Sequence, residues 1–116
     1  MGKDNQQKGH HAEQLATDFL IQAGYTILER NWHCAYGEID IIAQNDNTCV
    51  FIEVRARKTL DDAFASITPS KQEKMTRSAY SYLEQLPSNT LWRVDMIAVA
   101  WGSPPKIQHV EDVLGW

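Results

Sequence analysis

Two acidic residues, Asp40 and Glu53, interrupt stretches of the chain that otherwise have the composition of β-strands. The stretches cover residues 37–44 and 48–56 and are rich in apolar and β-branched side chains. Between them, residues 45–47 are Asn-Asp-Asn, types that tolerate the backbone conformations of a hairpin turn. A hairpin would bring the two carboxylates into one small region, where a divalent cation could bind them.

The length of the turn sets which residues face one another across this hairpin. A two-residue loop at Asp46-Asn47 and a four-residue loop both place Asp40 opposite Glu53. Glu38 then faces Arg55. A three-residue loop would put the apolar faces out of step, so the hydrophobic pattern favours the even loops. Opposed like charges destabilise a sheet and, when partly covered, raise the pKa of one carboxyl. A cation such as Mg²⁺, which prefers carboxylates, waters and phosphate oxygens, would remove that penalty.

The same residues also fit a purely structural interpretation. A solvated charged face would make Glu38 and Arg55 an ordinary cross-strand ion pair. Asp40 would then be neutralised by Arg57 or Lys58. The spacing leaves both interpretations open.

The elements that must position the hairpin follow from the rest of the pattern. In chain order, the sequence predicts a helix over 9–23, a strand over 25–29, irregular chain over 30–36, the two hairpin strands, a polar loop over 56–64, a helix over 69–86 with Thr68 as its N-cap, and strands over 91–101 and 106–110. This order, αβββαββ, predicts an α/β fold with a mixed central sheet flanked by helices, as a single domain over residues 1–116.

The charges are distributed unevenly along the chain. The net charge of −4 by itself argues against a nucleic-acid partner. Residues 55–77, however, hold six basic and three acidic residues, a net charge of +3, and the remaining five basic and twelve acidic residues carry −7. The basic side chains of this segment that could meet phosphate are Arg55, Arg57, Lys58, Lys71 and Lys74. The alternative is a solvated helix face next to a charged loop.

Other motifs are excluded by their spacing. No apolar run reaches the roughly 18–20 residues of a membrane span, and residues 1–11 lack the apolar core of a secretory signal. A cytoplasmic protein without a membrane partner is the expectation. Cys34 and Cys49 fit neither a disulfide framework nor a CxxC motif, and His33 with Cys34 lacks a second pair to complete a zinc site. Cys49 is expected to pack as a small apolar residue.

The hairpin motifs also resemble those of a known superfamily. GEID at 37–40 followed by FIEVRAR at 51–57 resembles the Asp…Glu-x-Lys core of the restriction-endonuclease-like nucleases. Within that superfamily the chain resembles the small bacterial YraN-like group, which is related to archaeal Holliday-junction resolvases. The resemblance covers nearly the whole chain, and its other residues are Gly9, Ala12, Glu13, Ala16, Lys71, Ala79, Arg93, Val94 and Asp95.

This resemblance implies a restriction-endonuclease-like fold and a metal-dependent phosphodiesterase acting on DNA, with branched or structured DNA among the candidate substrates. By position, Asp40 and Glu53 would bind Mg²⁺ or Mn²⁺. Arg55 would be the basic partner two residues after the glutamate, and Glu13 the fourth member of the site. Lys71 would help to steady the phosphate. The resolvase relatives imply a homodimer as one option.

Departures from the family pattern keep other functions open. The usual lysine is Arg55, which cannot be deprotonated and so can clamp phosphate but cannot act as a base. A nucleic-acid-binding module without efficient cleavage, or a structural interaction domain, are the alternatives. Glu13 could simply be a solvated first-turn residue. Asp95 is interpreted as half of a buried ion pair with Arg93, and no histidine is assigned a role.

Overall fold

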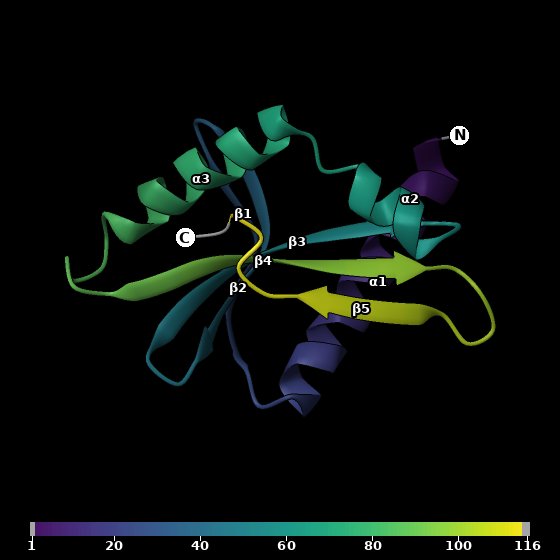
Figure 1. Cartoon of the computed structure of the whole chain (residues 1–116), viewed down its shortest axis with the longest axis horizontal. Helices are drawn as coiled ribbons and strands as arrows, with labels where there is room; N and C mark the ends of the chain where they lie inside the picture. Colours follow the sequence, from purple (N-terminus) through teal and green to yellow (C-terminus); the bar gives the residue numbers. More distant parts are fainter. Residues whose placement is uncertain (1, 115–116) are drawn as a thin grey trace.

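A five-stranded mixed sheet forms the centre of the chain, with helices against both of its faces (Figure 1). The computed structural model describes residues 2–114, with side chains described from Lys8 onward, so the ends of the predicted domain 1–116 lie outside the described residues. In order, the elements are α1 (Gly2–Gln22), β1 (Thr26–Cys34), β2 (Gly37–Asn45), β3 (Thr48–Arg57), α2 (Leu60–Ala65), α3 (Pro69–Leu83), β4 (Leu91–Ala100) and β5 (Lys106–Val110).

The strands lie in the order β1-β2-β3-β4-β5. Only the pairing of β3 with β4 is parallel, and the other three are antiparallel. Parallel neighbours cannot be joined by a tight turn, so the chain crosses from β3 to β4 through α2 and α3. The predicted α/β class with a mixed sheet between helices is confirmed.

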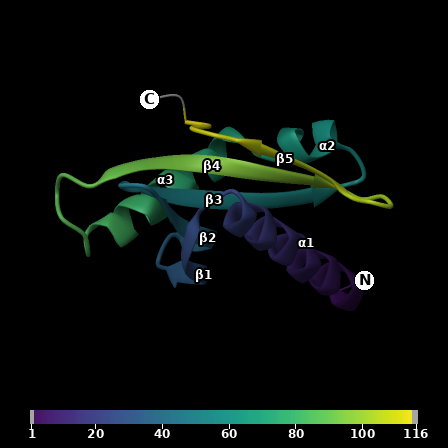
Figure 2. The same ribbon diagram turned by 90° about the horizontal axis from the view of Figure 1, so that it is seen from below.

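Apolar side chains cover each face of the sheet. One cluster joins the buried face of α1 to alternate residues of the strands: Ala12, Ala16, Leu20, Ile41, Ala43, Val50, Ile52, Ile97 and Val99. The opposite face packs against α3 through Ile39, Ile42, Cys49, Phe51, Ala79, Tyr82 and Val94, and against α2 through Ala63, Met96 and Ala98. Figure 2 shows α1 below the sheet when it is seen edge-on. The predicted packing of Cys49 is confirmed.

Local capping explains where α2 and α3 begin. The Thr68 side chain accepts a hydrogen bond from the Lys71 amide at 3.2 Å, as predicted for the N-cap. The predicted loop over 56–64 is wrong, because α2 forms within it. Thr59 caps this helix by accepting from the Asp62 amide at 3.0 Å, and the buried Ala63 anchors it on the sheet. The order is therefore αβββααββ.

Two predicted boundaries also change. Residues 30–36, expected to be irregular, are mostly strand, because β1 pairs with β2 from Thr26 opposite Gln44 to Cys34 opposite Gly37. Hydrogen bonds from the neighbouring strand hold this segment although its own sequence has no clear alternation. Helix α1 begins at Gly2 rather than near residue 9. Within residues 2–114, no helix combines the length and the apolar character that a bilayer span requires.

Candidate active site

The β2–β3 hairpin has the predicted register but ends one step before the two carboxylates. Asn45 pairs with Thr48, and the ladder continues to Ile41 opposite Ile52. The predicted direct pair of Asp40 with Glu53 lies beyond the last ladder pair. The Asp40 Oδ2 atom instead accepts a hydrogen bond from the Val54 amide at 2.8 Å. The two side chains are still near enough that the negative charge of Glu53 raises the pKa of Asp40.

Opposite Asp40, strand β1 also departs from regular strand geometry. Asn31 has a φ of 51°, in the left-handed region, and lies between the pairs Arg30–Ile41 and Trp32–Ile39. Strict alternation would put Ile39 and Ile41 on one face. Ile39 instead packs in the cluster under α3, whereas Ile41 packs under α1. Ile39 and Ile41 therefore lie on opposite faces of the sheet, so the regular alternation of β2 is interrupted next to Asp40.

Arg55 forms an ion pair with Glu53, with 2.8 Å between Nη2 and Oε1. Both side chains are largely covered, with exposed fractions of 17% and 13%. The alternative in which Arg55 pairs with Glu38 is wrong, because Glu53 is two residues away on the same strand face. The Arg55 Nε atom is buried and has no hydrogen-bond partner among the described residues. Lys71, from α3, adds a second positive charge near Glu53.

Helix α1 brings Glu13 to the same place. One carboxylate oxygen from each of Glu13, Glu38 and Asp40 lies within 4.8 Å of the other two. The Glu13 Oε2 atom is buried and lacks a hydrogen-bond donor among the described residues. The small side chains of Ala12 and Ala16, 2% and 0% exposed, let the helix lie close to the sheet. The solvated alternative for Glu13 is thus not what the structure has.

Glu38 was not among the site residues predicted from sequence. Its position two residues before Asp40 was the available signal, since strand alternation puts both on one face.

Burial sets the protonation of this cluster. Burial, together with the negative charge of Glu53, raises the pKa of Asp40 to about 8. Burial also raises the pKa of Glu53, although the positive charges of Arg55 and Lys71 oppose the change. Metal-free protein near neutral pH therefore holds a proton within this pair of carboxyls. A cation would stabilise the fully ionised form.

Two hollows meet at the carboxylates. The larger, about 550 Å³, lies between α1 and the end of β3, and the smaller, about 240 Å³, lies between β2, β3 and α3. Asp40, Glu53 and Arg55 line both.

The predicted basic residues line these hollows. Arg57 and Lys58 border the larger, together with Lys8 and Trp101, and Lys71 and Lys74 border the smaller. The fold thus gathers all five basic side chains predicted from sequence around the carboxylates. Lys8 and Trp101 were missed, because only the tertiary structure brings the first helix and the end of β4 here.

The donor atoms of the cluster are suited to one class of metal. Asp40, Glu13 and Glu38 offer only carboxylate oxygens, which Mg²⁺ and Mn²⁺ accept and for which thiolate-seeking metals have no preference. The buried, unpartnered oxygen of Glu13 is an acceptor that a cation would satisfy. Glu53 could also bind the ion if its Oε1 atom gave up the ion pair with Arg55.

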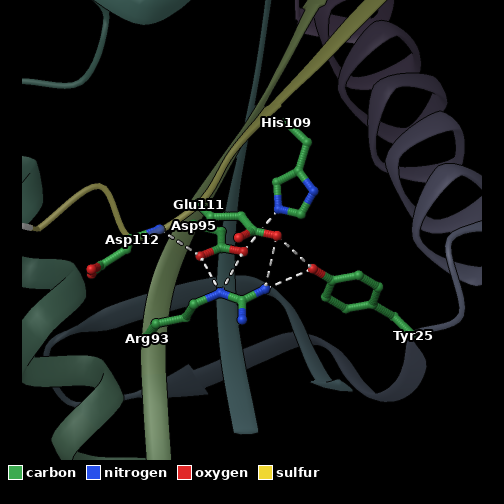
Figure 3. Close-up of polar contacts among 6 residues, drawn as sticks. All are labelled: Tyr25, Arg93, Asp95, His109, Glu111 and Asp112. Atoms are coloured by element: carbon green, nitrogen blue, oxygen red, sulfur yellow. Dashed lines mark hydrogen bonds and ion pairs between the residues drawn. The ribbon is translucent and has the colours of Figure 1, made fainter. Parts of the chain in front are cut away.

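A second buried carboxylate, Asp95, lies in a separate network (Figure 3). Its Oδ1 atom is 3.0 Å from the Arg93 Nε atom, and its Oδ2 atom is 2.8 Å from His109 Nε2. The Asp112 amide donates to it at 2.9 Å, and Arg93 also donates to the Tyr25 hydroxyl at 2.6 Å. The predicted buried pair of Arg93 and Asp95 is confirmed. His109, to which the sequence assigned no role, completes it.

Sequence comparisons agree with the motifs at the level of the family. The pattern of a family described as "Uncharacterised protein family UPF0102" matches residues 12–99. A UPF0102 protein of Roseiflexus castenholzii is 44% identical over 109 residues, 90% of this chain and 88% of the relative. One of Nitrosomonas eutropha is 47% identical over 95 residues, covering 80% and 82%, and one of Neisseria meningitidis is 42% identical over 110 residues, covering 91% and 96%. These names state a family and no activity.

Proposed function

The chain belongs to the uncharacterised protein family UPF0102, the YraN-like group, and from that premise we propose that it is a divalent-metal-dependent endonuclease acting on DNA. The proposal includes the restriction-endonuclease-like fold that the motifs resemble. The observation that carries it is the meeting of three carboxylates, from α1 and β2, where two hollows bordered by basic side chains adjoin. Glu38 is exposed, but the Glu13 Oε2 atom is buried without a donor among the described residues, and such an atom is often found where a cation or a reaction requires it.

Asp40, Glu13 and Glu38 would hold Mg²⁺ or Mn²⁺, with Glu53 as the further ligand expected from the motif. When bound, such an ion supplies positive charge that stabilises the phosphate oxygens and helps to activate a water. The reaction adds the oxygen of water to phosphorus and breaks one P–O ester bond, and the departing oxygen takes up a proton.

The basic side chains would hold the substrate backbone. Lys71 and Lys74 on one side, and Arg57 and Lys58 on the other, are exposed and border the two hollows. A DNA strand that passed from one hollow to the other would place a phosphate beside the carboxylates. Arg55 would contribute charge but no base catalysis, since its guanidinium stays protonated.

A second function, nucleic-acid binding without efficient cleavage, is supported by one contact. Arg55 already occupies a Glu53 oxygen at 2.8 Å, and this ion pair competes with a metal for the same atom. A protein that only binds DNA would use the basic side chains around the two hollows, and its carboxylates would have a structural role alone. Metal-dependent cleavage separates the two functions.

The test is cleavage of linear, nicked, single-stranded and four-way-junction DNA with Mn²⁺, Mg²⁺ or EDTA. We expect cleavage with either metal and none in EDTA. Asp40→Asn should reduce the rate at least a hundredfold, because it removes a ligand charge. The matched control is Asp46→Asn, an exposed turn residue with a φ of 53° that asparagine tolerates.

Thermal unfolding gives a readout that does not depend on activity. Millimolar Mn²⁺ should raise the Tm of the wild type and of Asp46→Asn by mass action, but not that of Asp40→Asn. An equal shift in all three proteins would mean that the ion binds elsewhere. A shift without cleavage of any DNA would favour the binding module.

A further inference from the structure

A stacked pair of aromatic rings, His11 and Trp101, stands beside the larger hollow and plays no part in the proposed catalysis. The ring centroids are 5.6 Å apart and the planes are inclined by only 17°. His11 belongs to α1, whereas Trp101 follows the last residue of β4. The two rings therefore join the first helix to the far end of the sheet.

Trp101 is positioned firmly but is not fully covered. Its backbone amide donates to the Arg57 carbonyl at 3.1 Å, which fixes it next to the end of β3. Its side chain is half-buried, and it borders two hollows. One is the hollow of about 550 Å³ that it shares with Asp40, and the other, about 320 Å³, lies toward the β4–β5 turn. The indole packs in part against the core cluster under α1, and its remaining surface borders the same hollow as the carboxylates.

The surroundings of this ring are basic. Lys8 and Arg57 border the larger hollow, Lys106 borders the hollow near the β4–β5 turn, and Lys58 borders both of these. All four are exposed, and none forms an ion pair with another described residue. Among the described residues that line the hollow near the β4–β5 turn, Asp61 is the acidic one. Cations around an open aromatic ring are the combination with which proteins bind single-stranded nucleic acid, phosphates on the charges and bases on the ring.

We propose that Trp101, backed by His11, is a base-stacking subsite for an unpaired nucleotide next to the scissile phosphate. The proposal rests on the proposed function, because it requires DNA in the larger hollow. Stacking needs a free base face, which a continuous duplex does not offer and a single strand, an overhang or a flap does. The preferred substrate is therefore DNA with unpaired nucleotides at the cut, in preference to a junction whose bases are all paired.

The experiment measures equilibrium binding in EDTA, where no cleavage can occur. Fluorescence anisotropy compares a duplex with a single-stranded overhang and a blunt duplex of the same length. Trp101→Leu should weaken binding to the overhang DNA by about fivefold to a hundredfold, the usual effect of losing one stacked base. Binding to the blunt duplex should change by less than twofold, and Trp101→Phe should retain most of the overhang affinity.

The matched control is Tyr80→Leu, which removes an exposed aromatic ring on α3, and it should bind both DNAs as the wild type does. Should Trp101→Leu fail to fold, the wild type still provides a test. A 2-aminopurine base in the overhang should be quenched on binding to the wild type and less so on binding to His11→Ala. No quenching, or an equal loss for both DNAs, would overturn the subsite.

The outcomes also separate this inference from the proposed activity. DNA cleavage with Mn²⁺ together with an unchanged overhang affinity in folded Trp101→Leu would overturn the subsite and leave the nuclease. If Trp101→Leu selectively loses overhang binding but the wild type cleaves no DNA, the subsite would be supported and the proposed nuclease activity would be rejected.

Discussion

Two aspartates, the buried Asp95 and the half-buried Asp40, lie in the same sheet but in opposite electrostatic situations. Asp95 is fully buried and accepts hydrogen bonds from Arg93, His109 and the Asp112 amide. Although burial opposes it, these bonds keep the pKa of Asp95 below its ordinary value. Asp40 has one backbone donor, and burial and the neighbouring Glu53 raise its pKa to about 8.

The difference shows which carboxylate the fold has satisfied and which it has left unsatisfied. A buried charge with a full set of donors needs nothing more and stabilises the structure that supplies them. Ionised carboxylates that face one another with too few hydrogen-bond donors destabilise the folded state unless a ligand such as a cation neutralises their charge. The Asp95 network therefore stabilises the fold, whereas the cluster at Asp40 is the candidate functional site.

The sheet itself differs between the two regions. The β3–β4 ladder is unbroken from Thr48–Leu91 to Arg57–Ala100, whereas the β2–β3 ladder stops at Ile41–Ile52. Where strands stay paired, side chains are closely packed. Where β2 leaves β3, a space opens, and α1 and α3 supply the groups that line it.

Replacement of Asp95 by alanine should have the largest effect. Arg93 and His109 would lose their buried partner, and such a loss typically lowers the free energy of unfolding by about 3–5 kcal/mol. Denaturant unfolding measures it. A cost below about 1 kcal/mol would mean that Asp95 is no better satisfied than Asp40, and the contrast would fail.

Asp40→Asn should have a smaller effect of opposite sign. The pKa of Asp40 is about 8 in the folded protein and near 4 in the unfolded chain, so the folded state binds more protons between these values. Stability from this group therefore falls as the pH rises from about 4 to about 8. In metal-free buffer at pH 8–9, the asparagine variant should be more stable than the wild type, because it has no ionised carboxylate beside Glu53.

The pH profile of the two regions sharpens this prediction. The lowered pKa of Asp95 gives stability that is present above about pH 4 and is lost as the pH falls through the folded pKa. The wild type should thus lose stability toward both acid and alkaline pH, and Asp40→Asn should show a smaller decline toward alkaline pH, because the pKa of Glu53 is raised as well. An alkaline decline of unchanged size in Asp40→Asn would assign it to another group.

Arg55 variants should give the smallest change in stability but a distinct change in DNA binding. Arg55→Ala removes one positive charge from both hollows, so the salt dependence of DNA affinity should flatten by about one phosphate contact. Arg55→Lys should keep the charge and retain or raise cleavage. Arg77→Ala, an exposed residue paired with Glu73, is the control. Unchanged affinity at low salt in folded Arg55→Ala would make Arg55 a structural partner of Glu53.

Much of the fold followed from local patterns. Apolar periodicity predicted the two long helices, and the turn residues together with the two apolar faces predicted the hairpin register from Asn45–Thr48 onward. What failed were segments whose neighbours outweigh their own sequence. Examples are the strand over residues 30–34, held by β2, and the short helix α2, held by Ala63 against the sheet.

The candidate site was only partly within reach of the sequence. Types and spacing were sufficient to single out Asp40, Glu53 and Arg55, since alternation along adjacent strands is a local property. Glu13 came from the family motif, and no local rule predicts how near α1 approaches the sheet.

The sequence by itself thus determined the residue types, the hairpin register from Asn45–Thr48 to Ile41–Ile52 and the family. The tertiary structure decided which charges are paired. The β2–β3 ladder ends at Ile41–Ile52, Arg55 pairs with Glu53 instead of Glu38, and Glu38 joins Glu13 and Asp40. The physical reason is that a charge is stabilised or destabilised by every group within a few ångströms, and those groups come from segments far apart in the chain.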